Sequence, residues 1–356
     1  MYTNILLFIY YIATMNTFFY NLGKSFKFIP LQSLMTITGQ NCISPFYHLI
    51  SDENVVHVKN LYRIKSVKQF NNELDFFLKY YEPVNFYEFI STEKPKKNRF
   101  LLSFDDGLRE FYDIVAPVLK QKGIPAICFL NSGFIDNKEL FFRYKASILI
   151  EQLKTFDLSP GKEKELKNWF QSKGLVYDNR FQSLLSISYQ TKTILDELAA
   201  LLGIDFSDYL QRHKPYLATG QIEELIAQGF HFGAHSVDHP LYSEINEDEQ
   251  LIQTKQSIDE ITSQFKLDYR LFSFPFSDAG VSKNFFEKTF DPTNSIADIT
   301  FGTAGLKKDS CIRNKQRIPV EIDNYTAEEI VYGEYLYYIC KAFLGKNTIS
   351  RFSSSP

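Results

Sequence analysis

Arg99-Phe-Leu-Leu-Ser-Phe104 is a short apolar run that ends in Asp105-Asp106-Gly107, and a helical pattern follows it from Leu108 to Gly123. A second apolar run, Pro125-Ala-Ile-Cys-Phe-Leu130, comes directly after. A strand, a helix and a strand in this order predict a βαβ unit with parallel strands. Further strand candidates lie at residues 230–234, 271–274, 296–301 and 316–320. The 356 residues are enough for one (β/α) barrel with insertions.

The rest of the chain is arranged around this barrel segment, which we place at residues 98–322. The other predicted parts are an apolar N-terminal segment at 1–20, an N-terminal layer packing on the barrel at 21–97, a helical insertion at about 136–221, and a C-terminal helix and tail at 323–356. Apolar residues at helical spacing predict a helix at 67–81. An aromatic-rich helix is predicted at 327–343.

The N-terminal segment allows two interpretations. It is mostly apolar from Ile5 to Tyr20 and has no charge before Lys24, so it lacks the basic start of a signal peptide. It is also short of the ~20 apolar residues of a spanning helix. The segment is therefore either a membrane anchor, or a buried helix or misassigned start, with Met15 as the natural first residue.

Charge and cysteine content bear on the binding partners and the cellular compartment of the protein. A formal net charge of -3 and a pI near 6.1 argue against nucleic acid as a partner. The 4 cysteines form no C-x-x-C pair and do not suggest a disulfide framework. This pattern favours the cytoplasm, with membrane association through the N-terminal segment as the alternative.

The first candidate site lies at the end of the strand over 99–104. Two adjacent carboxylates there are costly to bury unless a cation or a proton partner offsets them. Because the strand breaks at Gly107, Asp105 and Asp106 can turn toward one site, at the end of a parallel barrel where active sites form. The alternative is a helix N-cap, for which Asp is a common residue.

The second candidate site is His235-Ser-Val-Asp-His239, directly after a predicted strand. We expect both histidines on one helical turn, projecting from the same face. A chance pair on an exposed helix is the alternative. With Asp106 they form a set of two histidines and one carboxylate, which suits Zn²⁺ or another divalent first-row ion. Redox iron uses the same ligands, but the spare Asp105 favours a hydrolase, which needs a base near the metal.

The motifs Ser103-Phe-Asp-Asp-Gly107 and His235-Ser-Val-Asp-His239 closely resemble the first two motifs of the polysaccharide deacetylases, the NodB-homology family of carbohydrate esterases. The resemblance covers about residues 98–322 and implies a distorted (β/α) barrel. It implies that Asp105 is the catalytic base and that Asp106, His235 and His239 hold a divalent metal ion, with Zn²⁺ as the expected ion. The implied activity is removal of N-acetyl groups from an amino sugar in a polysaccharide or its lipid-linked precursor.

Two parts of this sequence depart from the family pattern. The counterpart of the third motif contains Phe274, Pro275 and Phe276, which we expect to bind substrate, but it lacks the usual Arg. Arg317 is a candidate replacement as the partner of Asp105, with a structural salt bridge as the alternative. No His follows His239 to match the usual general acid.

His48, in Pro45-Phe-Tyr-His48, is the candidate replacement for that acid if the N-terminal residues fold over the site. The alternative is a core or surface histidine. Two other functions stay open: hydrolysis of another amide, such as a cyclic ureide, and a carbohydrate-binding or scaffold protein without turnover. The missing acid motif favours the non-catalytic protein, whereas the intact Asp105 argues against it.

Overall fold

An eight-stranded parallel sheet forms the centre of the computed structural model, which describes residues 17–90, 97–155, 159–322 and 324–352. The strand order is β11-β9-β8-β7-β6-β5-β2-β12. The strands are β2 (Pro45–Tyr47), β5 (Leu102–Phe104), β6 (Ala126–Leu130), β7 (His231–Ala234), β8 (Leu271–Ser273), β9 (Ile299–Gly302), β11 (Asn314–Gln316) and β12 (Ile318–Pro319). Each predicted strand has a counterpart, but two of them are divided. Residues 99–104 form β4 (Arg99–Phe100), which belongs to a smaller sheet, and β5, and residues 316–320 span the break between β11 and β12.

The sheet curls into a nearly closed barrel, because its two edge strands are consecutive in the chain. Only Arg317 separates β11 from β12, which lie at opposite edges. Its backbone N–H donates to the carbonyl of Gly302 on the β9 side, and the N–H of Ile318 donates to Ser44 on the β2 side. This confirms the predicted distorted (β/α) barrel.

The inside of the barrel is filled by side chains. Phe129 of β6 meets Phe301 of β9 across the interior, with ring centroids 5.3 Å apart. On the other face of β6, Cys128 and Leu130 pack in the main core. Gly233 of β7 faces the interior, where a Cβ atom would come within 2.7 Å of the Phe129 ring. The barrel is thus a packed core, and any chemistry belongs at its ends.

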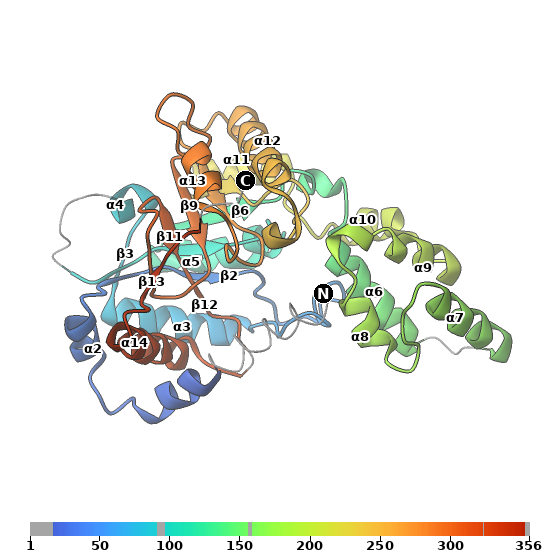
Figure 1. Ribbon diagram of the computed structural model, residues 1–356, viewed down its shortest axis with the longest axis horizontal. Coiled ribbons are helices and arrows are strands. Elements are labelled where there is room, and N and C mark those ends of the chain that lie inside the picture. Colours follow the sequence, from blue (N-terminus) through green and yellow to red (C-terminus); the bar gives the residue numbers. More distant parts are fainter. Residues whose placement is uncertain (1–16, 91–96, 156–158, 323, 353–356) are drawn as a thin grey trace.

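Helices surround this barrel, and small sheets extend it (Figure 1). The helices outside the insertion are α2 (Leu31–Thr38), α3 (Val67–Tyr80), α4 (Phe86–Ile90), α5 (Ala116–Lys122), α11 (Thr219–Ala227), α12 (Glu247–Phe265), α13 (Lys283–Thr289) and α14 (Ala327–Phe343), and residues 17–25 are also helical. A π-helix at Phe111–Val115 and a 3-10 turn at Tyr242–Glu244 complete them. Parallel pairs join β1 (Cys42–Ile43) and β3 (Glu82–Pro83) to β4 (Arg99–Phe100), and β10 (Lys308–Asp309) to β13 (Thr348–Ile349).

The predicted helices at 67–81 and 327–343 correspond to α3 and α14. Each begins with a capping box, formed by Ser66 and Gln69 for α3 and by Thr326 and Glu329 for α14. Such boxes satisfy backbone donors that the first turn leaves free, so they fix where the helix begins.

The N-terminal part of the chain contributes to the barrel itself. The sequence placed residues 21–97 in a layer packing on the barrel, but β2 pairs in parallel with both β5 and β12. Residues 1–16 of the apolar N-terminal segment lie outside the described residues. Among the described residues, no helix has the length and apolarity to cross a membrane.

The helical insertion lies to one side of the barrel (Figure 1). We call residues 142–213 the helical lobe; it holds α6 (Phe142–Thr155), α7 (Pro160–Ser172), α8 (Arg180–Leu185), α9 (Ile194–Leu202) and α10 (Phe206–His213). Short 3-10 turns at Ile135–Asn137 and Tyr189–Thr191 precede and interrupt it. Phe170, Leu195 and Leu198 of the lobe are fully buried in a second hydrophobic core. This core continues beyond the lobe to residues of the barrel side, among them Leu49 and Leu108.

Candidate metal centre

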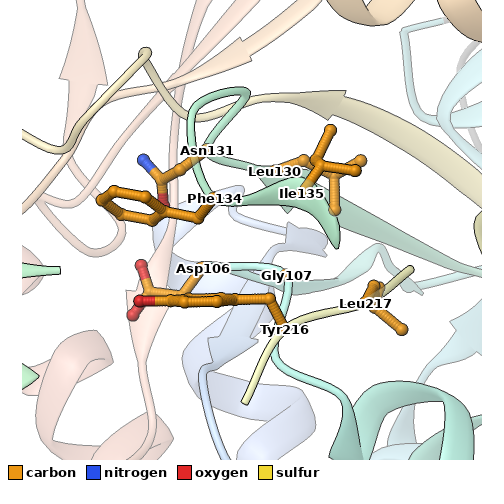
Figure 2. A pocket seen from close by; sticks show the side chains of 8 residues that line it. All are labelled: Asp106, Gly107, Leu130, Asn131, Phe134, Ile135, Tyr216 and Leu217. Atoms are coloured by element: carbon orange, nitrogen blue, oxygen red, sulfur yellow. The ribbon is translucent and has the colours of Figure 1, made fainter. Parts of the chain in front are cut away.

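Asp105 and Asp106 both lie at the same end of the barrel, but the backbone directs their side chains there in different ways. Alternation along β5 sends Phe104 to the outer core and Asp105 inward, where Arg317 meets it. Asp106 would then point outward, but its φ of 71° and the φ of 64° at Gly107 turn the chain. Figure 2 shows Asp106 at this turn, facing Asn131 and Phe134 across a narrow space. A left-handed φ is unfavourable for a residue other than Gly, and such outliers gather at functional sites.

The prediction that His235 and His239 share a helical turn is wrong. Residues 235–240 have no helical structure, and His239 has a φ of 63°. The reason is that the loop continues the β6–β7 pairing: the N–H groups of Ser132 and Gly133 donate to the carbonyls of Ser236 and Val237. These carbonyls are therefore used across the sheet and not along a helix.

The two imidazoles nevertheless meet Asp106. Its Oδ1 lies 3.1 Å from Nε2 of His239 and 3.6 Å from Nε2 of His235. One ligand atom from each of the three residues lies within 4.8 Å of the other two, and all three residues are buried. Among the described residues, no group satisfies Oδ1 with hydrogen-bond geometry. A buried carboxylate oxygen without a donor, next to two imidazole nitrogens, fits a divalent metal ion.

The protonation of these ligands also fits a cation. Nδ1 of His235 lies 2.8 Å from the carbonyl oxygen of Ser273, so Nδ1 carries the proton and Nε2 offers a lone pair. Burial lowers the pKa of His235 to about 4, despite the nearby Asp105, so the ring is neutral. Burial alone would raise the pKa of Asp106, but the nearby imidazoles, above all the charge of His239, outweigh it and lower that pKa. The ionised Asp106 and the neutral His235 are therefore in the forms that bind a metal ion.

Asp105 is held by a buried guanidinium. Arg317 donates from Nη1 to Oδ1 at 2.8 Å and from Nη2 to Oδ2 at 2.7 Å. Arg317 is fully buried and stacks over the Phe46 ring, with its Cζ 4.2 Å from the ring centroid. Burial would raise the pKa of Asp105, but the charge of Arg317 more than compensates and lowers it. The structure therefore brings Arg317 to Asp105 at the point where the barrel closes.

His48 lies beside the carboxylates because β2 is the neighbour of β5. Tyr47 and Phe104 are register partners, so His48 and Asp105 are the next residue on each strand. Nδ1 of His48 lies 2.7 Å from Oε2 of Glu321. Burial would lower the pKa of His48, but the hydrogen bond and charge of Glu321 raise it to about 9. A part-buried imidazolium thus stands next to the candidate base.

Of the three residues expected to bind substrate, only Phe276 is accessible. The expectation for Phe274 is wrong, because strand alternation turns it into the outer core against Tyr242 and Phe285. Pro275 is also buried. Phe276 is 44% exposed and its ring centroid lies 4.6 Å from that of His239.

The space shown in Figure 2 is too small to hold a sugar. It encloses about 150 Å³, whereas ligand pockets are usually about 300 Å³ or more. Its lining residues are Asp106, Gly107, Leu130, Asn131, Phe134, Ile135, Tyr216 and Leu217. Among the side chains next to the ligands, His48 is partly exposed and Phe276 is exposed.

The sequence reasoning missed several residues of this centre. Ser103 and Ser273 bind Arg317, and strand alternation could have identified both as polar side chains facing the barrel interior. Glu321, which holds Nδ1 of His48, lies four residues after Arg317 and was not singled out. Tyr144 of the helical lobe donates a hydrogen bond of 2.8 Å to Oδ2 of Asp106. No local pattern marks Tyr144, because its role depends on how the insertion packs.

Known proteins resemble both the sequence and the fold. The family model described as polysaccharide deacetylase matches residues 92–177 and 188–288, slightly more than half of the chain. The structure of IcaB from Ammonifex degensii aligns with a TM-score of 0.50 at 15% identity, over 82% of this chain and 97% of that one. The polysaccharide deacetylase BC0361 from Bacillus cereus aligns with a TM-score of 0.50 at 11% identity, over 82% of this chain and 68% of that one. None of the curated proteins matches.

Proposed function

Because the chain belongs to the polysaccharide deacetylase family, whose members are hydrolases of carbon–nitrogen bonds other than peptide bonds, we propose that it removes N-acetyl groups with the help of a metal ion. The substrate is a carbohydrate: an amino sugar in a polysaccharide or in its lipid-linked precursor. The observation that carries this proposal is the convergence of Asp106, His235 and His239 next to the separate carboxylate of Asp105.

Asp106, His235 and His239 are the proposed ligands, and Zn²⁺ is the proposed ion. Neutral imidazole and carboxylate are ligands that zinc accepts, and three protein ligands leave a position open for catalysis. When bound, such an ion lowers the pKa of water and polarises a carbonyl oxygen.

Asp105 is the proposed base. Its lowered pKa keeps the carboxylate ionised at neutral pH, the form that accepts a proton. The two hydrogen bonds from Arg317 fix its orientation. Asp105 takes a proton from the water that adds to the acetamide carbonyl carbon, and Arg317 stabilises the ionised form beforehand.

His48 is the proposed acid, in place of the histidine that the family usually supplies near its C-terminal end. With a pKa of about 9 it is protonated at neutral pH. Nδ1 is held by Glu321, so Nε2 is the ring donor that remains for the substrate. Its proton passes to the sugar nitrogen as the C–N bond breaks, which leaves acetate and a free amine.

Phe276 is the proposed contact for the sugar. An exposed aromatic ring next to a metal ligand offers an apolar surface to a sugar ring. The His239 ring also packs against Phe141, with ring centroids 4.4 Å apart, but Phe141 is buried. Phe276 is therefore the one of these two rings that a sugar can reach.

The direct test is incubation of the Zn²⁺-reconstituted protein with N-acetylhexosamine oligomers, with acetate as the readout. We expect acetate and free amine in equal amounts, and neither from the His239→Ala variant. A ring-opened product from a cyclic ureide without acetate would favour the other hydrolase. Sugar binding without any acetate would favour the non-catalytic alternative.

A further inference from the structure

The helical lobe touches the candidate metal centre at two separate points. From α6, Tyr144 donates its hydroxyl to Oδ2 of Asp106 at 2.8 Å. From the 3-10 turn at Tyr189–Thr191, Tyr189 lies 2.8 Å from both carboxylate oxygens of Asp238, the residue before the ligand His239. An insertion that served only as a wall would not need polar contacts to both metal-binding loops.

The two carboxylate oxygens of Asp106 have different partners. Oδ2 is occupied by Tyr144, whereas Oδ1 faces the two imidazole nitrogens and has no hydrogen-bond donor among the described residues. Rotation of the carboxylate would exchange these roles, and the hydrogen bond from Tyr144 opposes that rotation.

Tyr144 is itself held firmly enough to act in this way. Its side chain is buried, and its ring packs against Phe141 and His57, with centroids 5.0 and 5.1 Å away. These neighbours fix the ring, so its hydroxyl stays directed at Asp106.

The second contact acts on the loop that carries His239. Besides Tyr189, Asp238 accepts a hydrogen bond of 2.9 Å from Gln253 of α12 and pairs with Lys192. The loop between the two histidines is thus clamped between a barrel helix and the lobe. This matters because the loop has left-handed residues and no helix to stiffen it.

We propose that the helical lobe is a positioning part of the metal centre, in which Tyr144 holds one oxygen of Asp106 so that the other stays directed at the metal. This inference rests on the proposed metal site. It assigns Tyr144 no contact with substrate: Tyr144 is a positioning residue that acts through Asp106. Groups that orient metal ligands in this way are known to affect metal affinity as well as rate.

The experiment compares Zn²⁺ binding by the metal-free full chain and its Tyr144→Phe variant. We expect the zinc Kd to rise by about 10- to 100-fold in Tyr144→Phe. We also expect the absorption spectrum of the Co²⁺-substituted variant to change, because the carboxylate orientation changes. The matched control is Tyr20→Phe, which removes another buried phenol donating to a carboxylate, Glu334, at 3.0 Å. Its zinc Kd and Co²⁺ spectrum should equal those of the wild type.

The outcomes separate this inference from the proposed function. If the wild type fails to bind Zn²⁺, the metal site itself is wrong. If the wild type binds, His239→Ala does not, and Tyr144→Phe keeps the wild-type Kd and spectrum, only the role of the lobe is wrong. Should Tyr144→Phe not fold, Tyr189→Phe takes its place, because the side chain of Tyr189 is partly exposed and its hydroxyl can be lost without a buried gap. That variant tests the lobe at the His239 loop, and an unchanged zinc Kd would overturn the role of the lobe in positioning this ligand.

Discussion

Single residues of the site have backbone conformations that their side chains disfavour. Asp106, Ser236, His239 and Phe276 all have φ between 56° and 71°. For a residue other than Gly this costs about 1–2 kcal/mol. These positions surround one point, the convergence of Asp106 with the two histidines. The interactions made there must offset the strain, and asparagine and aspartate tolerate this region best.

The two adjacent carboxylates should separate in a pair of variants. Asp105→Asn keeps the shape and removes the proton acceptor, so we expect normal zinc content and turnover lower by about 10²- to 10⁴-fold. Asp106→Asn keeps the left-handed turn but loses the anionic ligand, so zinc binding should weaken. Metal analysis and acetate release measure the two effects. Near-normal turnover in Asp105→Asn would mean that the base lies elsewhere.

The proposed acid, His48, should determine how the rate changes at alkaline pH. His48 must be protonated to donate, and its pKa is raised to about 9, so turnover should fall as pH rises toward that value. A cation bound at Asp106 would repel the imidazolium and lower the pKa of His48. The alkaline limb of the pH–rate profile should therefore have a midpoint at or below about pH 9. We expect His48→Gln to abolish the alkaline limb and to slow turnover by about 10²-fold or more, without loss of zinc.

Glu321 provides the matched test of the same assignment. Glu321 accepts the backbone N–H of His48 at Oε2 and that of Leu49 at Oε1, so Glu321→Gln keeps an acceptor for one of the two and removes the charge that raises the pKa of His48. The alkaline limb should therefore move to lower pH. His213→Gln, on the exposed end of α10, is the control histidine and should change nothing. A limb that stays in place in Glu321→Gln would remove His48 from the mechanism.

At the scale of elements, the sequence predicted what depends on local pattern. The strands, α3 and α14 were found because apolar runs, apolar spacing and local composition are local signals. The turn carrying His235 and His239 was misread because its hydrogen bonds go to β6, which no local pattern reveals. The contact of Arg317 with Asp105 was a candidate only, since it depends on barrel closure. Tyr144 could not be predicted, because its partner lies across the insertion.

A buried ion-pair cluster next to the short β10–β13 pair stabilises the barrel. Arg351, just after β13, binds the carboxylates of Asp278 and Asp309, and all three side chains are nearly fully buried. Removing one partner of a buried ion pair costs about 3–5 kcal/mol. We therefore expect Arg351→Met to lower the free energy of unfolding by that amount at pH 7, measured in urea or guanidinium.

The same variant should change the response to acid. Burial would raise the pKa of Asp278, but the charge of Arg351, with side-chain hydrogen bonds, lowers it. A carboxylate whose pKa is lower in the folded state stabilises the fold above the pKa of the unfolded chain, and this contribution is lost as pH falls. The wild type should thus lose more stability between pH 7 and pH 3 than Arg351→Met does. Equal losses in both proteins would show that Asp278 does not contribute in this way.

At the scale of the whole molecule, two hydrophobic cores meet at the metal centre. The barrel and its helices bury one core, and the helical lobe buries another around Phe170, Leu195 and Leu198. The contacts of Tyr144 with Asp106 and of Tyr189 with Asp238 join them at the ligands. Metal binding and the folding of the lobe should therefore be coupled, since a lobe that opens releases both contacts.

This coupling can be measured by hydrogen exchange in a variant with a weakened lobe. Phe170→Ala removes a fully buried ring of α7, at a cost of about 3–5 kcal/mol. Amides of the helical lobe should then exchange faster, while those of α12 on the barrel keep their protection. Zn²⁺ at 100 times its Kd stabilises the state that binds it by about 2.7 kcal/mol. Because that state includes the docked lobe, added Zn²⁺ should slow exchange in the lobe and not only around the ligands.

Phe77→Ala in α3 is the control for a barrel defect, and it should leave lobe exchange unchanged. If Zn²⁺ protects the barrel alone in Phe170→Ala, the lobe folds independently of the metal centre.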